Sequence, residues 1–233
     1  MNPVRQVLKQ ALTAVLPPRW WLTRGPRACG LVALTFDDGP HPEYTPALLD
    51  MLHAQQVRAT FFVVGREAAR YPDVVRRMLA EGHDVGCHTY SHSDPSQTSA
   101  AALREELRAC RTLLAKLGVA PCRLFRPPLG KLTARKIIDL WQMQHSIVLW
   151  NIDPRDYRLK SPDEIAAWCA GYAPQGGDIV LLHDNRPGVL TAVPRLIQQV
   201  LAQGLGFQRI SAWTGPLPTP GSCDRPQFEE VCQ

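Results

Sequence analysis

Short apolar runs alternate with amphipathic segments along most of the chain. The amphipathic segments place apolar residues three and four positions apart, as a surface helix does, and cover residues 45–56, 66–80, 99–118, 133–144, 161–172 and 188–204. The apolar runs have the length and content of buried strands and cover residues 31–36, 59–64, 83–88, 123–128, 146–152, 178–183 and 207–210. The pattern therefore predicts strands and helices in regular alternation.

This alternation of nearly continuous apolar strands with helices is typical of a parallel sheet covered by helices. About seven such units within about 180 residues favour one small α/β barrel over two domains. One helix carries its own start signal, because Ser161 and Glu164 form an S-x-x-E capping box with Pro162 in the first turn.

Composition adds an ordinary globular balance to this picture. Of the 233 residues, 45% are hydrophobic and 20% are charged, and the formal net charge is +5. This mild charge permits an anionic partner, but no zinc-finger or RNP motif is present, so we expect no nucleic-acid partner. The seven cysteines form no C-x-x-C pair, which disfavours a disulfide framework and favours reduced thiols in a cytoplasm.

Polar residues gather at the carboxyl ends of the predicted strands or just after them. Because the carboxyl ends of parallel strands open onto one face of a barrel, side chains from separate motifs are expected to converge there. These residues are Asp37, Asp38, His88, His92, Arg126, Asp153, Asp156, His183 and Asp184. The adjacent carboxylates in "LVALTFDDGP" repel each other and disfavour a strand, so a compensating charge is expected beside them.

His88 and His92 are four residues apart, and one helical turn would place both imidazoles on the same side. With one carboxylate they would form a two-histidine, one-carboxylate metal set that leaves positions open for water and substrate. An isolated H-x-x-x-H pair is equally well explained by surface or helix-capping histidines. The "FDDGP" carboxylates at an equivalent strand end favour the metal site.

Five short motifs occur in the order "TFDDGP", "HTYSH", "FRPP", "DPRDY" and "LLHD". In this order they resemble the polysaccharide deacetylase family, which is also called carbohydrate esterase family four or the NodB homology domain. The resemblance spans residues 31–213. It implies an α/β fold, a distorted (β/α)7 barrel that forms a single catalytic domain and holds one divalent metal ion, usually zinc.

The resemblance also implies roles for individual residues in the first three motifs. It makes Asp38, His88 and His92 the metal ligands and Asp37 the general base. Arg126 would hold and tune that base. Neighbouring side chains at a strand end diverge, so only one of the two aspartates can face the ion while the other lies beside a water. A divalent metal lowers the pKa of such a water from about 15.7 toward about 7, within reach of a carboxylate base.

The same resemblance implies that the last two motifs, "DPRDY" and "LLHD", contain the general acid and part of the substrate site. His183 would be the general acid and Asp156 its orienting partner, while Leu181 would help to line a pocket for the acetyl methyl group. The rim departs from the family pattern, because Leu129 replaces a frequent tyrosine and Tyr157 a frequent tryptophan. Leu129 still provides a backbone N–H for the oxyanion, so these changes predict an altered substrate site and retained chemistry.

These features favour a metal-dependent hydrolase that removes an N-acetyl or other acyl group from an amino sugar in a glycan or a carrier-linked saccharide. Three other interpretations stay open: hydrolysis of another non-peptide amide bond, a non-haem iron oxygenase with the same ligand types, and a catalytically silent glycan-binding member. The predicted helices disfavour the oxygenase, whose usual scaffold is an all-β barrel. Intact Asp37, Arg126 and His183 disfavour the silent member.

The chain divides into an amphipathic, basic N-terminal extension at 1–28, the catalytic domain at 29–215 and a turn-rich, flexible tail at 216–233. The apolar stripe of the extension lies among arginines and precedes Trp20 and Trp21; it comprises Val4, Val7, Leu8, Ala11, Leu12 and Val15. Such a segment can lie in a membrane interface, where the substrate would be a lipid-linked sugar, or pack on the barrel or a partner. Both interpretations stay open.

The hydropathy of the chain bears on its location. No apolar run approaches the roughly 20 residues of a membrane span, and no cleavage site follows the short run "ALTAVL". We therefore expect no secretory signal and a cytoplasmic protein, which would be peripheral at the inner membrane surface if its extension binds lipid.

Overall fold

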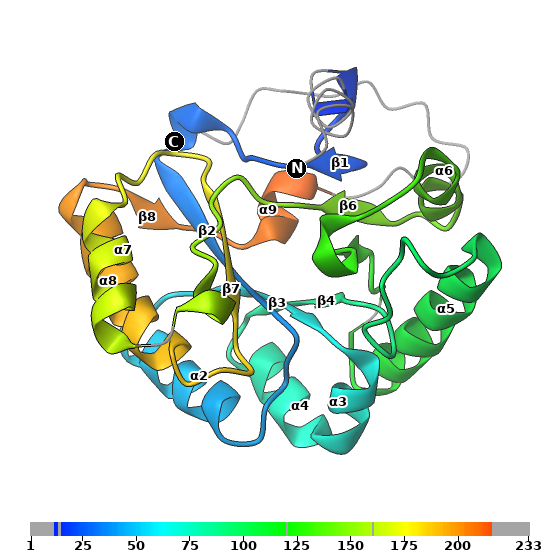
Figure 1. The fold of residues 1–233 in the computed structure, drawn as a ribbon, viewed down its shortest axis with the longest axis horizontal. Helices are drawn as coiled ribbons and strands as arrows, with labels where there is room; N and C mark the ends of the chain where they lie inside the picture. Colours follow the sequence, from blue (N-terminus) through cyan, green and yellow to red (C-terminus); the bar gives the residue numbers. More distant parts are fainter. Residues whose placement is uncertain (1–11, 14, 120, 160, 216–233) are drawn as a thin grey trace.

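The computed structural model describes residues 12–13, 15–119, 121–159 and 161–215. At its centre, parallel strands follow the order β1-β6-β5-β4-β3-β2-β7, and β8 pairs with β2 outside this path (Figure 1). The strands are β1 Trp21–Leu22, β2 Leu31–Asp37, β3 Thr60–Val63, β4 Asp84–Cys87, β5 Leu124–Phe125, β6 Ser146–Val148, β7 Ile179–His183 and β8 Gly206–Phe207.

The sheet curls because the segment after β6 returns to β7. Ile152 forms a parallel bridge to Val180, and the N–H of Leu181 donates to the Ile152 carbonyl at 3.0 Å. Helices α2 to α8 lie around the outside of the curled sheet, whereas α9 lies within the ring of strands (Figure 1), where Ile210 packs with the residues inside the barrel. The predicted fold class, a distorted α/β barrel in a single domain, is therefore confirmed.

The helices largely follow the amphipathic periodicity. They are α2 Tyr44–Ala54, α3 Gly65–Arg70, α4 Pro72–Ala80, α5 Ala100–Lys116, α6 Ala134–Gln142, α7 Pro162–Gly171, α8 Val189–Ala202 and α9 Ile210–Thr214, with short 3-10 turns η1 Arg27–Cys29, η2 Pro128–Gly130 and η3 Asp156–Arg158. The predicted single helix at 66–80 is wrong: Pro72 lacks an N–H to continue α3 and begins α4 instead. The predicted capping box is confirmed where the Ser161 hydroxyl accepts the Glu164 N–H at 3.2 Å.

Apolar side chains fill both faces of the sheet. Alternate strand residues, such as Phe36 and Phe61, belong to a large cluster that also contains the buried faces of the helices. The intervening residues, such as Ala33 and Phe62, form a smaller cluster inside the barrel. The guanidinium carbon of Arg126 lies 4.2 Å from the centroid of the Phe62 ring. The interior is thus a packed core that supports charged groups near the strand ends.

The segment around Trp21 belongs to the barrel. Trp21 and Leu22 pair with β6, and only 6% of Trp21 is exposed. Arg24 then forms a 2.9 Å ion pair with Asp178, just before β7. The folded domain therefore begins before residue 29, where the sequence placed its boundary, because a two-residue strand leaves no periodic signal.

Most of the predicted apolar stripe and the whole predicted tail at 216–233 lie outside the described residues. Of the stripe, Leu12 packs partly against the core while 79% of Val15 is exposed. Among the described helices, none combines the length and the apolar content that crossing a bilayer requires. The described cysteines are free thiols, namely Cys29, Cys87, Cys110, Cys122 and Cys169.

Candidate active site

The carboxyl ends of β2 and β7 place two predicted site residues side by side. Asp37 is the last residue of β2, and its register partner on β7 is His183. Asp38 follows with a φ of 75°, a left-handed conformation that is strained for a residue other than glycine. Such strain is common where a protein holds a functional side chain in place.

Asp38, His88 and His92 form a compact set of metal-ligating side chains, here called the metal set. Their ligand atoms all lie within 4.8 Å of one another. Nε2 of His88 is 3.6 Å from Asp38 Oδ1, and Nε2 of His92 is 3.1 Å from the same oxygen. Apart from the facing histidines, no group of the described residues donates to this buried Oδ1. Two nitrogens and one oxygen thus face a common point.

The chemistry of the metal set fits a divalent cation. Nδ1–H of His88 donates to the Arg126 carbonyl at 2.7 Å, so the lone pair of His88 is on Nε2, which faces Asp38. Burial lowers the pKa of His88, while the negative charges of Asp37 and Asp38 act to raise it. The effect of burial is the larger, so the ring is neutral at pH 7. Burial is the largest single influence on Asp38 and acts to raise its pKa, but the hydrogen bond from His92 and the electrostatic interaction with nearby histidines together lower the pKa well below its usual value. The hydrogen bond to Asp38 raises the pKa of His92. Carboxylates and imidazoles are ordinary zinc ligands.

A tight loop brings His88 and His92 together, and the predicted helical turn is wrong. No helix forms between them, and Thr89 and His92 have φ angles of 65° and 59°. The Glu106 carboxylate on α5 accepts two backbone N–H groups of this loop at 2.9 and 2.7 Å and a serine hydroxyl at 2.9 Å. These bonds replace the helical ones, and they fix the two rings with centroids 5.1 Å apart.

Arg126 reaches Asp37 from inside the barrel. Its side chain is fully buried, and Nη1 donates to Asp37 Oδ1 and to Thr35 Oγ1, each at 2.8 Å. Nη2 and Nε donate to two carbonyls at the end of β6, at 3.1 and 3.3 Å. The other Asp37 oxygen, Oδ2, lies 3.7 Å from Nε2 of His88. One oxygen of Asp37 is therefore held, while the other faces the metal set.

A buried Asp156 and a partly exposed His183 form a second pair at the same barrel mouth. Asp156 Oδ1 accepts Nδ1–H of His183, and Oδ2 accepts its backbone N–H, each at 2.7 Å. Burial lowers the pKa of His183, but the hydrogen bond and charge of Asp156, with Asp37 and Asp38, raise it to about 9. The imidazole is therefore protonated at neutral pH and can donate a proton from Nε2.

The chain is similar to known deacetylases over most of its length. Residues 24–147 match the family model described as polysaccharide deacetylase. The chain belongs to this family. It is 35% identical over 188 residues to a peptidoglycan-N-acetylglucosamine deacetylase of Bacillus cereus, and the match covers 78% of this chain and 68% of the relative. It is also 41% identical over 157 residues to a chitooligosaccharide deacetylase of Bradyrhizobium sp., and that match covers 67% of this chain and 71% of the relative.

The structure agrees with this membership. The solved chitin deacetylase of Colletotrichum lindemuthianum superimposes with a TM-score of 0.77 and 32% identity, and the match covers 87% of this chain and 95% of that chain. The family resemblance inferred from the five motifs is confirmed. The family is metal-dependent, and the metal set offers a site for the ion.

The residues predicted to contact the substrate lie on η2, η3 and β7. Leu129 in η2 is 58% exposed, and Tyr157 in η3 is 42% exposed with its ring edge-on to His183 at a centroid distance of 5.5 Å. Leu181 is 3% exposed and stands two residues before His183 on β7, so it shares the same face of the strand. Their contacts with a substrate stay predictions.

The residues that support the site from behind received no specific role from the sequence, although Asp184 was among the polar residues expected at the strand ends. Asp184 is buried, its Oδ2 accepts the Thr45 hydroxyl at 2.6 Å, and a Cβ added to Gly39 would lie 2.1 Å from that oxygen. Burial raises the pKa of Asp184 to about 7. Asp184 thus packs under the "DDGP" turn of the family. Its place in "LLHD" was a signal, but neither Thr45 nor Glu106 stands in any motif.

A polar cavity of about 410 Å³ opens beside the metal set. It is lined by Asp38 and His92 and also by Arg66, Tyr71 and Asn185. Nδ2 of Asn185 donates to Asp38 Oδ2 at 3.4 Å, which occupies that oxygen and leaves Oδ1 directed at the histidines. The cavity gives a polar ligand access to the metal set.

Proposed function

We propose that this chain is a zinc-dependent hydrolase that removes the N-acetyl group from amino sugars of a glycan. The observation that carries this proposal is the convergence, at one barrel mouth, of the metal set with the Asp37–Arg126 and Asp156–His183 pairs. The relatives named as deacetylases of peptidoglycan and of chitooligosaccharides support peptidoglycan-type or chitin-type glycans as the substrate class.

Asp38, His88 and His92 would hold the zinc ion. A bound zinc ion lowers the pKa of water and polarises a carbonyl oxygen. Zinc is favoured among divalent metals because two imidazoles and one carboxylate are the ligand types of many catalytic zinc sites. The hydrogen bonds that hold His88 and Asp38 support this by keeping their ligand atoms oriented.

Asp37 would act as the general base. Arg126 holds Oδ1 at 2.8 Å, so Oδ2 is the oxygen that can take a proton from the attacking water. Arg126 is fully buried and donates to three other oxygens, which fixes its guanidinium and hence the orientation of the base. Because Arg126 holds Oδ1, the proton of the attacking water would be transferred to Oδ2 alone.

His183 would protonate the leaving amine. Asp156 accepts Nδ1–H of His183, so the remaining ring proton is on Nε2. The water proton taken by Asp37 and the proton given by His183 balance the reaction, in which amide and water yield acetate and a free amine. The backbone N–H of Leu129 would stabilise the developing oxyanion, and Leu181 would contact the acetyl methyl group.

Hydrolysis of N-acetylated glycans tests the proposal directly. Metal-stripped protein, with and without added zinc, would be incubated with chitooligosaccharides and with peptidoglycan, and acetate and new primary amine would both be measured. We expect equal amounts of acetate and amine, and only after zinc is restored. Acetate without amine would indicate an ester substrate, and no product from either glycan would contradict the proposal.

We also propose that the protein is cytoplasmic and that the segment before β1 contacts the inner membrane surface, where the saccharide is lipid-linked. The support is the sequence pattern of apolar and basic residues. Because Trp21 and Leu22 pair with β6, the informative deletion removes residues 1–11 and retains this strand. Loss of co-sedimentation with anionic vesicles on this deletion is expected, and unchanged co-sedimentation would contradict the proposal.

A further inference from the structure

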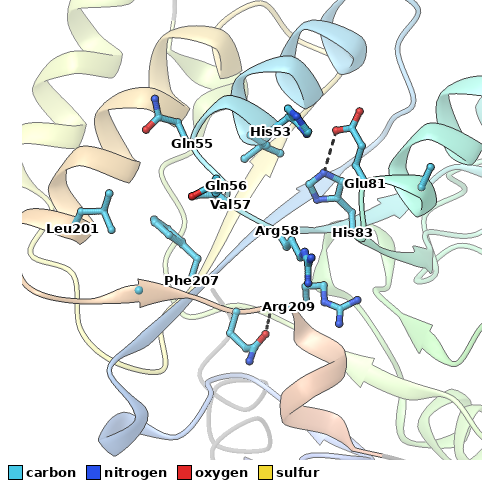
Figure 2. Close-up of a pocket in the computed structure, with 14 residues that line it drawn as sticks. His53, Gln55, Gln56, Val57, Arg58, Glu81, His83, Leu201, Phe207 and Arg209 are labelled. Carbon is cyan, nitrogen blue, oxygen red and sulfur yellow. Dashed lines mark hydrogen bonds and ion pairs between the residues drawn. The ribbon is translucent and has the colours of Figure 1, made fainter.

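A second cavity, here called the amino-end cavity, lies at the other end of the barrel from the metal set. It measures about 810 Å³ and is lined by the end of α2 with the loop to β3, the turn between α4 and β4, the end of α8, and β8 with the following loop (Figure 2). Two of these segments lead into the amino ends of β3 and β4, whereas the metal set lies at carboxyl ends. A ligand in this cavity therefore cannot touch the reacting atoms.

The amino-end cavity carries an excess of positive charge. Arg58 is exposed and forms no ion pair within the described part of the chain. Arg209 reaches Asp84 at 3.4 Å, but that carboxylate already accepts a backbone N–H and a hydroxyl of Ser211 at 2.7 and 2.9 Å. Glu81 is the one acidic residue among the described lining residues, and a neighbouring guanidinium outside the cavity binds its Oε1 at 2.6 Å. An anionic ligand would restore the charge balance.

A donor and an acceptor face each other in this cavity without bonding. Oε2 of Glu81 is buried and has no hydrogen-bond partner among the described residues. Nε2 of the buried His83 lies 3.9 Å from it, too far for a hydrogen bond (Figure 2). Nδ1 of His83 accepts the Ala59 N–H at 3.0 Å, so Nε2 carries the hydrogen. A hydroxyl satisfies both groups, because it can donate to Glu81 and accept from His83.

The protonation of His83 agrees with this role as a donor. Burial lowers the pKa of His83 to about 4; Glu81 opposes the shift, and Arg209 and Arg58 add to it. The ring is therefore neutral at pH 7, with a single N–H directed toward Glu81. A second anion at this point would meet the Glu81 carboxylate, so the group bound here must be neutral while the anionic group lies nearer the arginines.

The remaining lining suits the body of a sugar. The Phe207 ring points into the cavity (Figure 2), and Leu201 and Val57 lie beside it. Gln55 and Gln56 are exposed at the rim and offer amide donors and acceptors. An aromatic face with polar groups around it matches a pyranose, which has apolar C–H faces and hydroxyls at its edge.

We propose that the amino-end cavity binds an anionic saccharide unit. Its carboxylate or phosphate would contact Arg58 and Arg209, one hydroxyl would lie between Glu81 and His83, and its apolar face would pack on Phe207. The site is separate from the hydrolytic centre, and it does not depend on the activity proposed there.

Titration of the full chain, followed by the shifts of its backbone amides in NMR spectra, tests this site. We expect glucuronate or glucose 6-phosphate to shift residues 55–58 and 206–209, and glucose to bind about tenfold more weakly for lack of an anion. Tighter binding of glucuronate would identify the anionic group as a carboxylate, and tighter binding of glucose 6-phosphate would identify it as a phosphate. Arg58→Ala should weaken the binding of the preferred anionic sugar by about tenfold. Phe207→Ala should weaken the binding of both that sugar and glucose.

Arg108→Ala is the matched control, because Arg108 is an exposed arginine on α5 that does not line the cavity. It should bind as the wild type does. Arg58→Ala should fold normally, since Arg58 is exposed and makes no ion pair with a described residue. The proposal is overturned if no sugar shifts these residues, if glucose binds as tightly as glucuronate and glucose 6-phosphate, or if Arg58→Ala has no effect. Tighter binding of adenosine monophosphate than of either anionic sugar would likewise replace the saccharide with a nucleotide.

Discussion

At the scale of single residues, the ion pair between Asp37 and Arg126 places two opposite charges inside the barrel, next to the metal set. A buried guanidinium is costly unless it is paired and hydrogen-bonded, and Arg126 meets both conditions through Asp37, Thr35 and two carbonyls. Removing either partner would leave an uncompensated buried charge. Asparagine at position 37 is the mildest test of the base, because its side-chain oxygen can still accept from Arg126.

The pair formed by His183 and Asp156 makes a prediction for pH dependence. Asp156 raises the pKa of His183, so Asp156→Asn should lower it. The acid must be protonated, and the alkaline limb of the kcat profile should therefore move to lower pH by about 1 to 2 units. Asp153→Asn is a matched control, because Asp153 accepts the backbone N–H of Arg155 and is expected to leave the limb in place. An unshifted limb in Asp156→Asn would show that His183 is not the acid.

At the scale of elements, the turn from β2 to α2 is fixed from β7. Asp184 packs against Gly39 and accepts the hydroxyl of Thr45 on α2, so three elements meet behind Asp38. No side chain fits at position 39, since an added Cβ would lie 2.1 Å from Asp184 Oδ2.

This packing predicts that Gly39→Ala loses about 2 kcal/mol of unfolding free energy, the usual cost of overpacking a buried position. Gly171→Ala is the control, because an added Cβ at Gly171, the last residue of α7, meets nothing within 4 Å. It should lose no stability. Urea denaturation of the two variants measures the difference, and equal stabilities would contradict the role of Asp184 behind the turn.

The elements also show what sequence could and could not predict. Strands such as β2 and β7 follow from uninterrupted apolar runs, and α5 follows from its amphipathic period. Strand β1 could not be predicted, because two residues carry no period and its pairing with β6 joins segments more than 120 residues apart. The break at Pro72 could have been predicted, since proline cannot continue a helix.

The candidate site divides in the same way. Asp37, Asp38, His88 and His183 could be found because each ends or follows a strand, and parallel topology gathers strand ends. The loop between His88 and His92 could not, because its shape depends on the Glu106 carboxylate on the following helix, α5, outside every motif. A contact between a loop and a side chain of the next helix leaves no local periodic pattern.

At the scale of the whole molecule, metal binding and stability should be coupled. The metal set joins the ends of β2 and β4, so a bound ion would tie two strands together in the folded state alone. Zinc at about 100 times its Kd should add about 2.7 kcal/mol and raise the melting temperature. Thermal unfolding with a chelator and with zinc measures this. His92→Ala, which alters a partly exposed member of the metal set, should remove most of the shift, and an equal shift in this variant would contradict the assignment.

The most direct test of the account separates metal binding from proton transfer. Zinc content, folding and acetate release would be measured on the same preparations of the wild type, Asp37→Asn and His88→Ala. We predict that Asp37→Asn retains zinc and its fold but loses at least about 100-fold in kcat, whereas His88→Ala loses both zinc and activity. Acetate release by Asp37→Asn at the wild-type rate would contradict the central claim.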